Sequence, residues 1–132
     1  MGYGDITMNV LKLVLTAAFF VAAPTWAGDL TGPQNNAVRS AKEYLSMTGF
    51  SRDGLIHQLS SDAGEGYDIS DATVAVDSLN IDWNQEAVKS AKEYLNMMGF
   101  SCKSLIEQLS SSAGDKYTVD QATYGAKQAG GC

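Results

Sequence analysis

The sequence predicts an all-α protein: a signal peptide followed by a tandem repeat of two three-helix, helix-turn-helix units. The stretch SAKEYLSMTGFS at 40–51 returns as SAKEYLNMMGFS at 90–101. Shifted by fifty residues, the chain aligns 37–77 with 87–127 without a gap, and 23 of these 41 pairs are identical. Apolar residues recur at helical spacing in both copies. Self-similarity at a fixed period is typical of a repeat protein, so the repeat unit decides the fold.

The start of the chain is typical of a secretory signal peptide. A short basic segment precedes an apolar run of eleven residues at 13–23, and Ala27 supplies the small residue before a cut. We expect cleavage between Ala27 and Gly28, with translation starting at Met1 or at Met8. A membrane-spanning helix needs about 20 apolar residues, so we expect no stable membrane anchor. The alternative is a buried N-terminal helix.

Each repeat unit is expected to turn a tight corner between its first two helices. In the first unit, an apolar stripe leads to Leu45, and Gly49 suits the left-handed position that ends a helix. Phe50 should fold back onto Leu45. Ser51 should cap the second helix, with Phe50 and Leu55 packed as a hydrophobic staple. The repeated Gly-Phe-Ser is therefore interpreted as a structural corner.

A polar loop then leads to a third helix in each unit. Asp68 with Asp71, and Thr118 with Gln121, are expected to cap these helices as capping boxes. The expected buried residues are Ile69, Ala72, Val76 and Leu79, with Val119, Ala122, Ala126 and Ala129 in the copy. The smaller side chains of the copy predict a weaker last helix and a frayed end at 130–132.

These elements set the expected domain boundaries. We expect a signal peptide at 1–27, a linker at 28–36, repeat 1 at 37–81, an inter-repeat linker at 82–86 and repeat 2 at 87–132. Trp83, in the inter-repeat linker, is expected to pack between the two repeats.

The charge of the chain argues against nucleic-acid binding. It contains 15 acidic and 9 basic residues, a net charge of −6, and residues 1–27 hold one of each, so the remainder keeps −6. A helix-turn-helix can place a helix in the major groove, but binding also needs clustered Lys and Arg for the phosphates. The second helices, SRDGLIHQLSS and SCKSLIEQLSS, lack such clusters. An acidic surface favours a basic partner instead.

The sequence offers no catalytic residue and no cofactor site. His57 is the only histidine, and Glu107 replaces it in the second copy, so we interpret it as solvated. Glu43 and Glu93 occupy repeated helix positions that we also interpret as solvated faces. A small hydrolase would need a polar pocket that the sequence does not reveal.

A metal site is not predicted either. Asp62, Glu65, Asp68 and Asp71 lie close in sequence, and carboxylate oxygens suit Ca²⁺. The spacing of an EF-hand loop and its closing Glu are absent, however, and helix capping accounts for Asp68.

The two cysteines, Cys102 and Cys132, suggest a disulfide in an exported chain. Such a bond would close a loop of about 30 residues and stabilise the fold by about 3–4 kcal/mol. The alternatives are a free thiol on the tail and pairing between chains.

The repeat resembles a known family. The pattern YLxMxGFSxxxLIxQLSSxxGxxY, the linker AVDSLNIDWNQEAVKSAKEYL and the closing YTVDQATYGA are similar to the Ltp family, host cell surface-exposed lipoproteins with tandem helix-turn-helix repeats. The resemblance covers nearly all of residues 37–127. Phage-encoded members act in superinfection exclusion: outside the membrane, they stop an incoming phage from passing its DNA, by engaging the phage tape measure protein.

The resemblance therefore implies an exported, non-enzymatic protein-interaction module whose partner is a protein, the tape measure protein of a phage being the candidate. The alternative is a chromosomal envelope protein that binds a surface or matrix partner and has no phage role. Gly28 stands where the family carries its lipid-anchored Cys. We therefore expect a soluble periplasmic or secreted protein.

Overall fold

The computed structural model describes residues 29–132, and every regular element in that part of the chain is a helix. The helices are α3 (Gly32–Met47), α4 (Arg52–Ser60), α5 (Ile69–Ser78), α6 (Trp83–Met97), α7 (Cys102–Ser110) and α8 (Val119–Gln128). This confirms the all-α repeat. The predicted signal peptide and its cleavage point between Ala27 and Gly28 lie outside the described residues. None of the six helices has the length and apolar character needed to cross a membrane.

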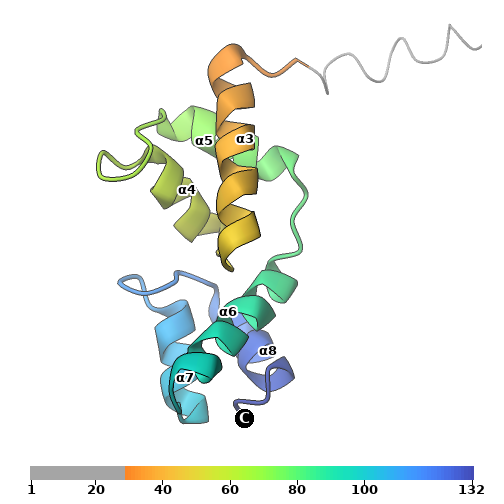
Figure 1. The fold of residues 1–132 in the computed structure, drawn as a ribbon, viewed down its shortest axis with the longest axis vertical. Helices are drawn as coiled ribbons and strands as arrows, with labels where there is room; N and C mark the ends of the chain where they lie inside the picture. Colours follow the sequence, from red (N-terminus) through yellow and green to blue (C-terminus); the bar gives the residue numbers. More distant parts are fainter. Residues whose placement is uncertain (1–28) are drawn as a thin grey trace, which may run out of the picture. The chain divides into compact units, whose positions relative to one another are not determined.

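Each repeat packs around a small core of its own, and Figure 1 shows how its three helices are arranged. In repeat 1, α3 and α4 pack against α5, and in repeat 2, α6 and α7 pack against α8. The repeat 1 core consists of Ala41, Leu55, Ile56, Leu59, Ala72 and Val76. The repeat 2 core consists of Ala87, Ala91, Leu105, Leu109, Tyr117, Ala122 and Ala126. The buried faces of the first two helices are therefore those that the periodicity predicts.

The helices begin earlier than the predicted linkers allow. Helix α3 starts at Gly32, so residues 32–36 of the expected linker at 28–36 are helical. Helix α6 starts at Trp83, and the Asp82 carboxylate accepts a hydrogen bond from the Gln85 amide as its N-cap. The expected linker at 82–86 is thus mainly a first helical turn. The Asp82 cap satisfies a main-chain amide that the first turn leaves without a helical partner, and this stabilises the start of the helix there.

The corner between the first two helices has the predicted serine cap, and one prediction about it is wrong. Ser51 accepts a hydrogen bond from the Gly54 amide at 2.9 Å, and Ser101 caps α7 in the same way. Phe50 packs edge-on against Tyr44, with ring centroids 5.7 Å apart. Gly49 does not adopt the predicted left-handed conformation, since Gly66 and Gly130 are the described glycines with positive φ. Its role in the fold is a different one, described with the site below.

The third helices differ in how they are capped. Thr118 and Gln121 form the predicted capping box on α8. Asp68 makes no side-chain cap on α5, and Asp71 instead accepts a hydrogen bond from Gln34. The prediction that Ile69 and Val119 are buried is wrong: each is the first residue of its helix, and they are 67% and 64% exposed.

Arg52 and Cys102 occupy equivalent positions at the start of the second helix, and each is bonded to a different part of its repeat. In repeat 1, Arg52 pairs with Asp77 through two hydrogen bonds of 2.7 and 2.9 Å. In repeat 2, the structure joins Cys102 to Cys132 in a disulfide. The tail is held as well, because the Gly131 amide donates to the Ala126 carbonyl at 2.8 Å. The frayed end predicted for residues 130–132 is therefore wrong.

Candidate functional site

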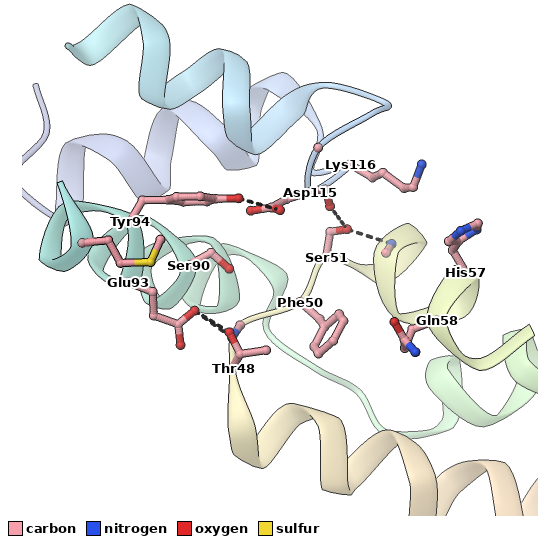
Figure 2. A pocket seen from close by; sticks show the side chains of 14 residues that line it. Thr48, Phe50, Ser51, His57, Gln58, Ser90, Glu93, Tyr94, Asp115 and Lys116 are labelled. Atoms are coloured by element: carbon pink, nitrogen blue, oxygen red, sulfur yellow. Dashed lines mark hydrogen bonds between the residues drawn. The ribbon is translucent and has the colours of Figure 1, made fainter. Parts of the chain in front are cut away.

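A pocket of about 460 Å³ lies at the junction of the two repeats (Figure 2). Four segments contribute its lining: the corner after α3 (48–51), the first turns of α4 (54–58), the second half of α6 (90–97) and the loop before α8 (114–116). The same corner segment that the sequence repeats is thus used here to join one repeat to the other.

One carboxylate of α6 is hydrogen-bonded to the corner of repeat 1. Glu93 Oε1 accepts a hydrogen bond from Thr48 Oγ1 at 2.6 Å and another from the Gly49 amide at 3.3 Å. The prediction that Glu93 belongs to a solvated face is therefore wrong, whereas its repeat equivalent, Glu43, is exposed. The two glutamates have the same sequence context and different environments.

Three further hydrogen bonds complete the junction. The Phe50 amide donates to Glu86 Oε1 at 3.1 Å, and Lys89 Nζ donates to the Leu45 carbonyl at 2.7 Å. The Ser51 hydroxyl donates to the Asp115 carbonyl. These bonds join the end of α3 and the corner after it to α6 or to the loop before α8, so the contact is polar, and four of its five hydrogen bonds pair a main-chain atom with a side chain.

Gly49 is required by this close approach. A Cβ atom at this position would lie 2.4 Å from Ser90 Oγ and 2.9 Å from the Glu86 carbonyl oxygen. At Gly99, the equivalent position in repeat 2, a Cβ atom would meet nothing within 4 Å. The first glycine is therefore explained by the junction, and the second is not.

Burial raises the pKa values of three groups in and beside the pocket. The Asp115 carboxylate accepts a hydrogen bond from Tyr94 Oη at 3.0 Å, and burial raises its pKa above the ordinary value. Burial likewise raises the pKa of Glu86. Desolvation also raises the pKa of Tyr117, whose hydroxyl is hydrogen-bonded to Ser90 at 2.7 Å. Two carboxylates are thus partly removed from water: that of Asp115 in the pocket lining, and that of Glu86, which binds the main-chain amide of the lining residue Phe50.

The lining combines negative charge with apolar surface. The Glu93 and Asp115 carboxylates come with the Phe50 ring and with Met97, whose side chain is 71% exposed. Carboxylates beside an aromatic face suit a Lys or Arg side chain, whose stem is apolar and whose head is charged. Methionine adapts its shape to different partners.

The arrangement does not resemble a hydrolase site. The exposed His57 lies with Lys116 on the far side of the pocket from Tyr94 (Figure 2). The Ser51 hydroxyl, which lines the same pocket, donates to a main-chain carbonyl and not to His57. No nucleophile and base therefore meet at this serine.

The carboxylates considered for a metal do not assemble. Glu65 accepts a hydrogen bond from Tyr44 Oη at 2.5 Å, Asp71 bonds to Gln34, and Asp62 is exposed. Within residues 29–132, no group of three His, Cys, Asp or Glu side chains is placed to hold a metal ion.

The comparison with known proteins identifies the family. The family of host cell surface-exposed lipoproteins, Ltp, matches residues 33–79 and again residues 82–128, once for each repeat. The chain belongs to the Ltp family. The matched ranges follow the helices, since Asp82 is the N-cap of α6.

A solved structure of an Ltp protein supports the assignment. It is the structure of Ltp, a superinfection exclusion protein from the Streptococcus thermophilus temperate phage TP-J34, at a TM-score of 0.67 and 30% sequence identity. The alignment covers 75% of this chain and 97% of that one. No curated protein matches the chain. The family, the repeat architecture and the helical fold predicted from the sequence are therefore confirmed.

Proposed function

We propose that this protein is an exported, non-enzymatic interaction module that excludes superinfecting phage by binding the tape measure protein and so blocking DNA injection. The observation that supports the proposal is the similarity to a superinfection exclusion protein over 97% of that protein's length. Both repeats take part in the similarity. The alternative role, binding an envelope or matrix partner without a phage, is separated from this one by the experiment below.

The pocket at the repeat junction is the proposed contact site. A basic side chain of the partner would place its charge between Glu93 and Asp115 and its stem against Phe50. The net charge of −6 would speed the encounter with a basic partner, and the rate would fall as salt is added.

Export is proposed from the start of the chain and from the cysteines. Residues 1–27 have the pattern of a signal peptide, and cleavage before Gly28 would release a soluble chain. A disulfide such as Cys102–Cys132 persists in oxidising compartments outside the cytoplasm.

The proposal is tested by phage infection. A host expressing the full chain is compared with one expressing residues 28–132, which lack the export signal. We expect the exported protein to lower plaquing efficiency while phage adsorption stays normal and DNA entry falls. If neither form protects against a broad phage panel, the exclusion role is wrong, and binding of an envelope partner becomes the function to pursue.

Neutralising Asp115 should make the protein more stable and less active. Burial raises the pKa of Asp115 in the folded chain, so folding favours the protonated carboxyl. The stability that this group contributes is fully present below its ordinary pKa of about 4, and it is lost as the pH rises through the raised pKa. Asp115→Asn removes this loss and should raise the melting temperature at pH 7. It should also weaken binding of a basic partner about tenfold or more.

Asp62→Asn is the matched control for this prediction. It removes the same charge from an exposed position outside the pocket lining, and should leave both melting temperature and protection unchanged. If Asp115→Asn protects as well as the parent chain, the pocket is not the contact site. The exclusion role itself would still be judged by the comparison of exported and retained protein.

A further inference from the structure

The junction between the repeats has a docking corner and an acceptor face. The docking corner is residues 48–51. The acceptor face comprises the side chains of Glu86, Lys89, Ser90 and Glu93 and the carbonyl of Asp115. Because the chain is a repeat, it contains a second corner at residues 98–101 and a second acceptor face on repeat 1. Neither is used within the described chain.

The second corner is exposed. Ser51 is 1% exposed at the used corner, whereas Ser101 is exposed at the second one. Nothing lies within 4 Å of a Cβ built at Gly99, and Met98 is 60% exposed. The second corner thus has the same Gly-Phe-Ser sequence and the same capped turn as the first, without a surface to pack on.

The second acceptor face has nearly the same chemistry. Asn36, Arg39 and Glu43 replace Glu86, Lys89 and Glu93, so an oxygen acceptor, a cation and a carboxylate return in the same order, and all three side chains are exposed. Ser40 is hydrogen-bonded to Tyr67 at 3.0 Å, as Ser90 is to Tyr117 at 2.7 Å.

The loop that completes the acceptor face is also repeated. In repeat 1, Tyr44 Oη donates to Glu65 and accepts from Gln58, and in repeat 2 Tyr94 makes the same two bonds with Asp115 and Gln108. The carbonyl of Glu65 is therefore at the position where the carbonyl of Asp115 accepts the Ser51 hydroxyl.

We propose that a second copy of this chain docks its corner 98–101 on the repeat 1 acceptor face, continuing the internal junction from molecule to molecule. The inference is independent of the proposed function. One bond of the internal junction is lost, since Met98 replaces Thr48 and has no hydroxyl to donate to Glu43. The two repeats of one molecule are linked by the chain, which supplies a high effective concentration for their contact. Two separate molecules lack this link, so their association is weaker than the internal contact.

Docking of this kind joins different surfaces of the two molecules, so each added copy presents a new free corner. Head-to-tail contacts of this sort extend into open chains unless the rotation closes a ring. We therefore expect dimers and longer species that grow with concentration, and not a single symmetric dimer.

Sedimentation velocity across a concentration series tests the proposal, using the purified exported protein. Gly99→Ala is tolerated in the single molecule, where nothing lies within 4 Å of the added Cβ. In the docked pair this Cβ would clash with Ser40 of the other copy, just as a Cβ at Gly49 would lie 2.4 Å from Ser90 Oγ. Glu43→Arg changes the acceptor face instead: it replaces the accepting carboxylate with a cation, which repels the amide donors of the second corner. Each should lower the association constant at least about tenfold. Gln128→Ala, an exposed change at the end of α8, should associate as the parent does.

Mixing the two variants gives the sharper result. Gly99→Ala keeps an intact acceptor face and Glu43→Arg keeps an intact corner, so an equimolar mixture should form a heterodimer that cannot extend. A parent chain that stays monomeric at about 1 mM, the effective concentration of a short tether, overturns the proposal. So does association that both variants leave intact, or a mixture that stays monomeric while the parent associates. Circular dichroism establishes that each variant is folded.

Discussion

Leu105→Ala is expected to lower the free energy of unfolding by about 2–5 kcal/mol, the range for truncating a fully buried leucine. Leu105 is fully buried, and the repeat 2 core around it contains four alanines, so few large side chains are present to close the cavity. Domains of this size are stable by only about 5–15 kcal/mol, so repeat 2 should be close to unfolding at 37 °C.

The loss should be confined to repeat 2, because each repeat has a core of its own. Trp83 packs against the repeat 1 core and is the single tryptophan of residues 28–132, so in that part of the chain its fluorescence reports on repeat 1. In urea, circular dichroism of Leu105→Ala should fall in two steps, with Trp83 fluorescence following the second. Coincident transitions would show that the repeats unfold together. Val119→Ala, an exposed aliphatic change, should move stability by less than about 0.5 kcal/mol.

Removal of the disulfide is the second change with a large expected effect. Cys102 and Cys132 are separated by 30 residues, and in the chain-entropy estimate a loop of this length stabilises the fold by about 3–4 kcal/mol. Cys102→Ser with Cys132→Ser should lower the free energy of unfolding by that amount, measured by denaturant titration. Reduction of the parent chain should have the same effect.

The ion pair of repeat 1 is the natural control for the disulfide. Arg52 stands in repeat 1 where Cys102 stands in repeat 2, but its pair with Asp77 is partly exposed, and exposed pairs contribute about 0.2–1 kcal/mol. Arg52→Ala should therefore cost much less than loss of the disulfide. If Arg52→Ala and loss of the disulfide lower the free energy of unfolding equally, the covalent bond adds little to the contacts that packing already makes.

The helices and their caps were predictable because they depend on local spacing. Leu55, Leu59 and their copies lie at helical intervals, and Ser51 and Ser101 precede them at the N-cap position. The third helix was harder, since Ile69 fits the apolar period yet is the first residue of α5 and remains outside the core. Asp68 fits a capping pattern, but Asp71 bonds to Gln34, 37 residues away in sequence.

The site could not be predicted because it depends on contacts between the repeats. Glu43 and Glu93 have the same neighbours in sequence, and only the folded chain shows that Glu93 receives the corner. Gly49 and Gly99 present the same difficulty, since a terminating glycine and a glycine that permits close approach look alike in sequence. Repetition predicts shared packing and gives no sign of which copy makes the contact.

Trp83 makes the packing of repeat 1 depend on the helix that follows it in sequence. It is the first residue of α6, yet its side chain packs on the repeat 1 core, while the buried core of repeat 2 contains only residues that follow it. A fragment that ends at residue 81 would lack part of its own core, whereas one that begins at residue 82 would keep every buried residue of repeat 2. During synthesis, repeat 1 therefore cannot complete its packing until the next helix has begun to emerge.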